Sequence, residues 1–153
     1  MTAGELRRLV QLIEQDHELL NRQTTSLGRA LESLRRGTDS AGAVNVLEDL
    51  RRYFVDQLLP HMQEEEQEFF PIVAQALRGG ARQVGRLRAE HRALEEDIER
   101  FRSELTLSRF VAPPAEEAVL GDLVAVGRQL WARLRDHARL ENRLLARLKR
   151  TAA

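Results

Sequence analysis

The sequence contains no cysteine, which excludes disulfides, thiolate nucleophiles, iron–sulfur clusters ligated by cysteine and cysteine-based zinc sites. It also lacks the basic surplus of nucleic-acid-binding proteins and polybasic membrane anchors, because 24 Lys plus Arg stand against 24 Asp plus Glu. No apolar run approaches the roughly 18 residues of a membrane span, and the N-terminus has no signal-peptide core. We therefore expect a cytoplasmic protein with neither nucleic-acid nor membrane partners.

The composition that is present is typical of one globular domain. A chain of 153 residues can bury a sizeable core as a single domain spanning 1–153, and 42% hydrophobic with 31% charged residues excludes disorder. Turn-forming residues cluster at 37–42, 78–80 and 110–114. These breaks leave four long segments rich in Leu, Arg, Glu and Ala, which are good helix formers.

The ends and faces of the four segments agree with helices. Thr2 with Glu5 matches a capping box, Asp39 or Ser40 can cap the second helix, and Pro114 suits the first turn of the fourth. Within each segment, apolar residues recur at alternating steps of three and four, which predicts a seam facing a core. No stretch alternates like a strand. The sequence predicts an all-α, up-down-up-down four-helix bundle.

Two prolines interrupt the second segment. A proline inside a helix removes one backbone hydrogen bond and clashes with the preceding turn. We expect a kink near Pro60 and a break or strong bend at Pro71. His61 lies 18 residues before the second turn and His91 lies 11 residues after it. In straight helices this difference of seven residues would place the two histidines roughly 10 Å apart along the bundle axis. A break at Pro71 would bring them to the same height.

The four histidines of the chain are distributed one to each helix, and all of them fall on the apolar seam. They are His17, His61, His91 and His137. A single seam histidine is best interpreted as a core residue with its hydrogen bonds satisfied. A seam covers about two of seven helix positions, so the coincidence of four favours a shared function.

Two glutamates extend this pattern. Glu65 and Glu141 each follow a histidine, His61 or His137, by four residues and so share its helix face. A buried glutamate beside imidazoles is costly without a cation. Nitrogen and oxygen donors suit iron, manganese or zinc. Six donors exceed the needs of one tetrahedral ion, so we predict two ions bridged by Glu65 and Glu141.

At these residues the sequence resembles the hemerythrin family, in its bacterial form the HHE cation-binding domain. The resemblance is carried, over nearly the whole chain, by His17, His61-x-x-x-Glu65 with Phe69-Phe70-Pro71, Glu90-His91, and His137-x-x-x-Glu141. It implies a non-haem di-iron centre in which the four histidines are terminal ligands and the two glutamates bridge, usually with an oxo or hydroxo bridge. Such centres bind dioxygen or nitric oxide, or act in iron and redox sensing.

The chain departs from oxygen-carrying hemerythrins at one position. Those proteins have a second histidine one turn after the third-helix histidine, where this chain has Glu95. If Glu95 is a ligand, the centre is rich in carboxylates and favours oxidised metal. If Glu95 is solvated, one ion has an open position. We include Glu95 as the seventh candidate ligand, and in either case we do not expect reversible oxygen carriage.

The neighbouring acidic residues Glu64, Glu66 and Glu68 are interpreted as a solvated helix face. The function predicted from the sequence is that of a di-iron domain that binds or senses dioxygen, nitric oxide, peroxide or iron. Two alternatives remain open at this point. The same site can belong to a redox enzyme acting on peroxide or nitric oxide, or the bundle can be a metal-free interaction module.

Overall fold

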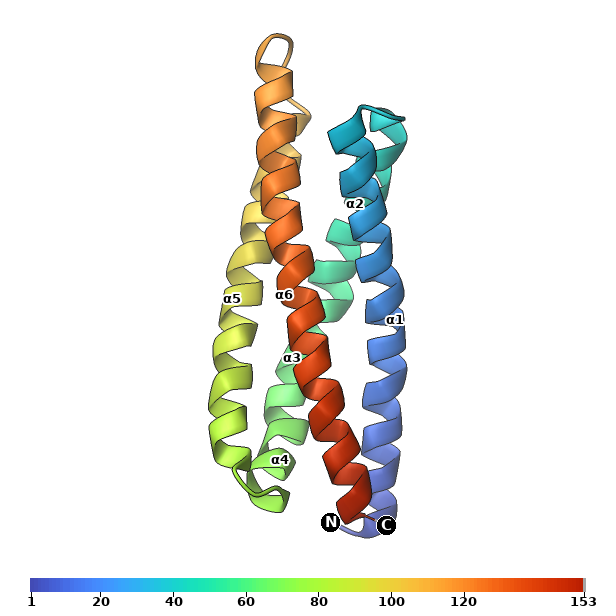
Figure 1. Ribbon diagram of the computed structural model, residues 1–153, viewed down its shortest axis with the longest axis vertical. Helices are drawn as coiled ribbons and strands as arrows, with labels where there is room; N and C mark the ends of the chain where they lie inside the picture. The colour runs from blue at the N-terminus through green and yellow to red at the C-terminus, as the bar shows by residue number, and fades with distance from the viewer. Residues whose placement is uncertain (153) are drawn as a thin grey trace.

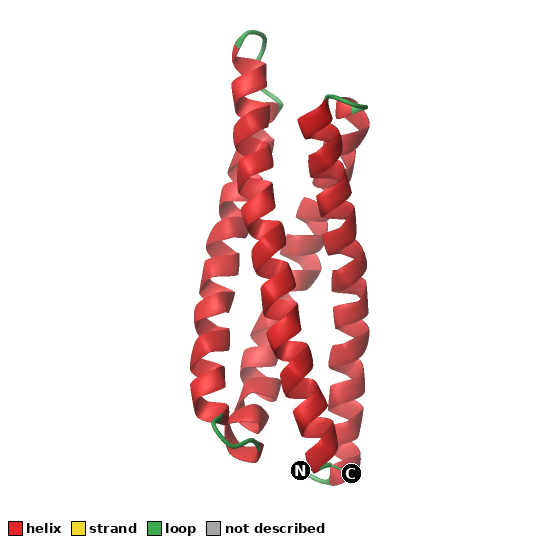
Figure 2. Ribbon diagram, in the orientation of Figure 1, coloured by secondary structure: helices red, strands yellow, loops and turns green. Residues whose placement is uncertain are grey.

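A computed structural model describes residues 1–152, which are almost entirely helical and contain no strand within that range (Figure 2). Three of the four bundle helices are unbroken: α1 (Ala3–Arg36), α5 (Gly80–Ser108) and α6 (Ala115–Thr151). The second is built from five consecutive pieces, namely α2 (Ser40–Tyr53), η1 (Phe54–Leu58), α3 (Leu59–Glu64), η2 (Glu65–Phe69) and α4 (Phe70–Ala76). The helices run up, down, up and down, with both termini at one end (Figure 1), which confirms the predicted fold.

The helix ends lie where the sequence signals place them. Thr2 and Glu5 form the reciprocal capping box of α1, and Asp39 caps α2 by accepting a hydrogen bond from the amide of Gly42. Gly37 ends α1 with a left-handed φ of 70°, a conformation that costs glycine nothing because it has no Cβ. All three predicted turns are confirmed.

Of the break or strong bend predicted at Pro71, the break is wrong, because helical backbone continues from Phe70 to Ala76. A π-helical segment ends two residues before each of the two prolines. There the amide of Leu59 donates to the carbonyl of Phe54, and the amide of Phe70 donates to the carbonyl of Glu65, which is five residues back instead of four. Each wide turn opens the helix ahead of the proline ring, so the chain accommodates both prolines without ending the helix.

The apolar core is divided into two clusters. One cluster includes Leu20, Phe54 and Phe101, and the other includes Ile13 and Phe70. On α1, Ile13 and Leu20 lie on either side of His17, so the histidine level separates the clusters. This arrangement places a polar layer between tightly packed apolar side chains, which hold its geometry fixed and limit the access of water to it.

None of the helices of residues 1–152 combines the length and the apolar character that a membrane span requires.

Candidate metal centre

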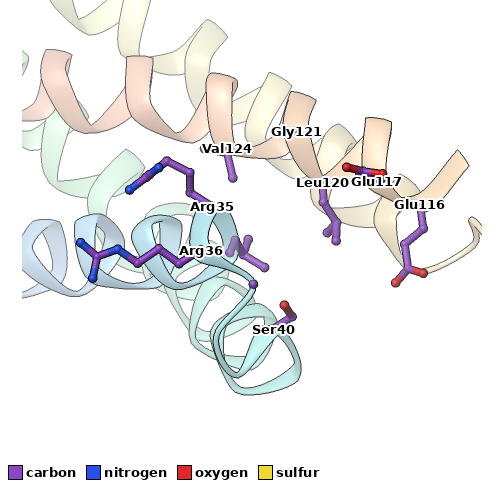
Figure 3. A pocket seen from close by; sticks show the side chains of 10 residues that line it. Arg35, Arg36, Ser40, Glu116, Glu117, Leu120, Gly121 and Val124 are labelled. Carbon is purple, nitrogen blue, oxygen red and sulfur yellow. The ribbon is translucent and has the colours of Figure 1, made fainter.

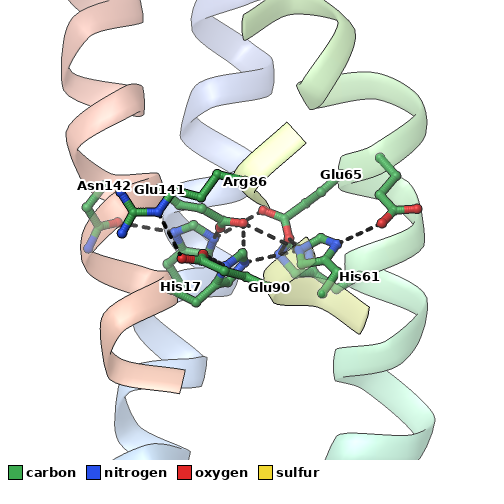
Figure 4. A network of polar contacts seen from close by, with 10 residues as sticks. His17, His61, Glu65, Arg86, Glu90, Glu141 and Asn142 are labelled. Carbon is green, nitrogen blue, oxygen red and sulfur yellow. Dashed lines mark hydrogen bonds and ion pairs between the residues drawn. The ribbon is translucent and has the colours of Figure 1, made fainter. Parts of the chain in front are cut away.

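Six of the seven candidate ligands meet in the interior of the bundle, where Figure 4 shows Glu65, Glu141 and His17 converging between the helices. Each helix of the bundle contributes to the site. The contributors are His17 on α1, His61 on α3, Glu65 on η2, His91 on α5, and His137 and Glu141 on α6. Glu141 and Glu65 are only 1% and 3% exposed, which is rare for carboxylates without a partner.

The six side chains form two overlapping groups of possible metal ligands. Glu65, His91, His137 and Glu141 form one group, and His17, His61 and Glu65 form the other, with donor atoms in each group within 4.8 Å of one another. Glu65 belongs to both. Two neighbouring positions that share a carboxylate are the arrangement that a pair of metal ions needs.

Glu65 links the two histidine pairs. Its carboxylate oxygens lie 3.4 Å from Nε2 of His17, 3.3 Å from Nε2 of His61 and 3.6 Å from Nε2 of His91. His61 pairs with His17, at 5.7 Å between ring centroids, whereas Nε2 of His91 faces Nε2 of His137 at 3.1 Å. Nε2 of His61 and Nε2 of His91 thus meet the same oxygen of Glu65 in one layer, although the helix continues through Pro71.

Glu141 lies opposite Glu65 and reaches both pairs as well. Its oxygens are 2.8 Å from Nε2 of His17, 2.5 Å from Nε2 of His137 and 3.6 Å from Nε2 of His91. Even so, several atoms of the layer lack a hydrogen bond. Nε2 of His61, Oε2 of Glu65 and Oε1 of Glu141 are buried without a partner in hydrogen-bond geometry. Buried polar atoms normally have partners, so this donor set fits a group of cations.

Each of the four histidines turns its other nitrogen, Nδ1, outward to an oxygen on the neighbouring helix that precedes it around the bundle. The pairs are Asp16 with His61 at 3.1 Å, Glu66 with His91 at 3.1 Å, Glu90 with His137 at 2.7 Å, and Asn142 with His17 at 3.2 Å. An acceptor at Nδ1 holds the proton there and leaves Nε2 directed at the centre, as in metal-binding histidines generally.

Sequence reasoning missed this outer ring of Asp16, Glu66, Glu90 and Asn142. For Glu66 the interpretation as a solvated residue is wrong, since it accepts a hydrogen bond from His91, whereas Glu64 and Glu68 are exposed as expected. A signal was present, because every outer partner is the immediate sequence neighbour of a candidate ligand. Adjacent helix residues point about 100° apart, so the neighbour of an inward ligand is directed toward the next helix.

The two glutamates keep three of the histidines protonated at neutral pH when no metal is bound. Burial lowers the pKa of His17, but hydrogen bonds and the negative charges of Glu141 and Glu65 outweigh it and raise that pKa to about 10. The same balance raises the pKa of His91 to about 9 and that of His137 to about 10. Burial raises the pKa of the carboxyls in turn, yet the imidazoles outweigh it and hold the pKa of Glu141 well below its usual value.

Glu95 is not brought to this layer. Its side chain is exposed and belongs to neither group of ligands. Four residues of helix rotate a side chain by about 40°, and after His91 the inward positions are taken by Leu94 and Ile98. Glu95 is therefore a solvated helix residue, which is the second of the two possibilities stated for it above.

A cleft of about 230 Å³ between α1 and η2 reaches the layer from one side. It is lined by Leu9, Leu12, Ile13, Asp16, His61, Glu64, Glu65, Glu68 and Phe69. His61 is the most exposed of the six ligand candidates, at 14%. Another hollow, of about 710 Å³, lies where α1 ends and where α2 and α6 begin (Figure 3), and none of the seven candidate ligands lines it.

Comparison with known proteins supports a cation-binding site in this bundle. Residues 8–148 match the family model described as the hemerythrin HHE cation-binding domain. The iron-sulfur cluster repair protein DnrN of Neisseria gonorrhoeae is 29% identical over 138 residues, which cover 90% of this chain and 84% of the relative. No solved structure gives a significant match. The family match spans almost the whole bundle, and the chain therefore belongs to the hemerythrin HHE cation-binding domain family.

Proposed function

We propose that the protein binds two iron ions in the polar layer. His17 and His61 would hold one ion, His91 and His137 the other, and Glu65 and Glu141 would lie between them. The observation that carries this proposal is the placement of two buried carboxylates between two imidazole pairs, with three of the buried donor atoms lacking hydrogen bonds. A metal-free interaction module has no need for four imidazoles and two carboxylates converging inside its core.

The role that we propose for the centre is in the repair of iron–sulfur clusters, since the relative from Neisseria gonorrhoeae is named for that role. Bound iron would supply redox chemistry and a position for a small ligand such as dioxygen or nitric oxide. The chain's own contribution is to fix four Nε2 atoms, to exclude bulk water with its two apolar clusters and to leave one cleft to His61.

Iron stoichiometry tests the proposal directly. Anaerobic reconstitution with ferrous iron is expected to give close to two ions per chain, because the six donors exceed the needs of one ion. Metal analysis after removal of excess iron, with circular dichroism to verify folding, measures this. One ion or none in folded protein would refute the di-iron centre.

Optical spectra of the loaded protein separate the possible uses of the centre. Separate exposure to air, nitric oxide and peroxide is expected to change the spectrum if a small ligand reaches the iron through the cleft. Sustained turnover of peroxide or nitric oxide would favour the redox enzyme instead. Recovery of activity by a cluster-damaged iron–sulfur enzyme, on addition of the loaded protein but not of the apoprotein, tests the repair role.

Substitution of Glu95 tests whether the centre extends beyond six residues. Because Glu95 is exposed and outside both ligand groups, we expect Glu95→His to leave iron stoichiometry, spectra and autoxidation rate unchanged. Stopped-flow absorbance of the reduced protein mixed with air compares the two proteins. A longer-lived oxygenated species in the Glu95→His variant would instead show that position 95 reaches the metal.

A further inference from the structure

We propose that the two metal positions are unequal, which rests on the proposed di-iron function. The ion between His91 and His137 is retained, and the ion between His17 and His61 exchanges with solvent. Asn142 is the positioning residue that sets much of this difference, because it is the one neutral member of the outer ring.

The donor sets of the two positions differ. Around His91 and His137 both carboxylates lie within 4.8 Å of both imidazoles, whereas in the other pair Glu141 contacts only His17 and Glu65 alone lies close to both rings. His91 is also only 1% exposed and packs against the ring of Phe70, with 5.0 Å between the ring centroids. Donors that already converge in a drier setting bind an ion more tightly.

The outer partners reinforce the difference. An imidazole that donates its Nδ1–H to a carboxylate becomes a more basic ligand, and hydrogen bonds to charged acceptors are about twice as strong as neutral ones. Glu90 accepts from His137 at 2.7 Å and is 25% exposed. His17 instead donates to the neutral amide oxygen of Asn142 at 3.2 Å. The partner of His61, Asp16, is 56% exposed, so solvent screens its charge.

Access to solvent also favours exchange of the ion between His17 and His61. The 230 Å³ cleft reaches His61 and Glu65, and its lining includes the carboxylates of Asp16, Glu64 and Glu68 but no lysine or arginine. Nε2 of His61 and Oε2 of Glu65 are also among the buried atoms without a hydrogen bond. A cation leaving or arriving through this cleft would therefore meet oxygen donors throughout its path.

Chelator competition tests the inequality. Protein loaded anaerobically with two ferrous ions is mixed with excess bipyridine, and the absorbance of the chelate is followed. Two phases of equal amplitude are expected, one ion per phase. Asn142→Asp makes the His17 partner anionic, and this variant should slow the fast phase about tenfold, the scale of such outer contacts, while the slow phase changes by less than about twofold.

The matched control is Gln129→Glu, which adds the same charge at an exposed position of α6, about 20 Å along the helix from Asn142. It should leave both phases unchanged. Glu90→Gln makes the opposite change at His137 and should accelerate the slow phase about tenfold. Circular dichroism verifies the fold of each variant, and if Asn142→Asp does not fold, Glu90→Gln decides alone.

The outcomes separate the two proposals. A chain that binds two ions and releases both in a single phase overturns the inequality but leaves the di-iron function intact. The inequality is equally overturned if Asn142→Asp acts on the slow phase, or if Gln129→Glu slows release as much as Asn142→Asp does. Binding of fewer than two ions refutes the di-iron function itself.

Discussion

Replacement of Glu141 by alanine is expected to abolish the paired centre, reducing bound iron from two ions to at most one. The carboxylate of Glu141 lies within 3.6 Å of Nε2 of His17, His91 and His137, so its loss removes a donor from both positions at once. Metal analysis after anaerobic reconstitution measures the loss. Glu65→Ala should have the same effect, because Glu65 also contacts both histidine pairs.

The Glu141→Ala substitution should also lower the free energy of unfolding of the metal-free protein. Removal of one partner from a buried ion pair costs about 3–5 kcal/mol, because the remaining charges lose their compensation. Alanine is a strong helix former, so the circular dichroism spectrum should stay helical. Urea unfolding of the metal-free protein measures the change in the free energy of unfolding. Glu95→Ala is the matched control, since it removes an exposed carboxylate that touches no ligand. A Glu141→Ala variant that retains both ions and an unchanged spectrum would contradict the bridging role.

The fold and the inner layer could be predicted from the sequence because both depend on periodicity within one helix. The steps of three and four that place Leu20 and Ile13 in the core also place His17 there. Likewise, Glu141 follows His137 by one turn and must share its face. Such local geometry carries directly from spacing to structure, without knowledge of how the helices pack.

The remainder depended on contacts between helices. Asn142 and His17 are 125 residues apart, and only the rotation of α6 against α1 brings them within 3.2 Å.

The path of the second helix through Pro71 was mispredicted for a different reason. The rule that proline ends a helix assumes four-residue hydrogen bonding, and a π turn starting at Glu65 changes that spacing. The same wide turn begins at a candidate ligand, so the irregular backbone and the site coincide.

The second large effect is the release of protons from the histidines when metal binds. In the folded apoprotein the pKa of His17 and that of His137 are raised to about 10 and that of His91 to about 9, against an ordinary value of 6.5. Raised values mean that the folded state holds these protons more tightly than the unfolded state. Their stabilisation is fully present below pH 6.5 and is lost as the pH rises through 9 to 10. The lowered carboxyl pKa of Glu141 acts at the other extreme, where stability is lost as the pH falls below 4.5.

The protons on the histidines occupy the place of the metal charge. A histidine binds a metal ion only through a neutral nitrogen, so each imidazolium must lose its proton before it can become a ligand. Three to four imidazolium charges come close to the charge of two divalent cations. The exchange therefore leaves the charge facing Glu65 and Glu141 nearly unchanged, which explains how one set of buried carboxylates can be compensated with and without metal.

Binding of two ferrous ions at pH 7.5 is accordingly expected to release about three to four protons, because three histidines have pKa values of about 9 to 10 and the pKa of His61 is raised in the same direction. Each displaced proton makes the overall binding constant rise tenfold per pH unit, so that constant should rise roughly a thousandfold from pH 7 to pH 8. Anaerobic calorimetry in two buffers of different ionisation enthalpy counts the protons, and Glu95→Gln, which leaves every ligand in place, should give the same count. Release of fewer than one proton per ion would mean that the histidines are already neutral in the apoprotein, and the charge exchange would then be wrong even if both ions bind.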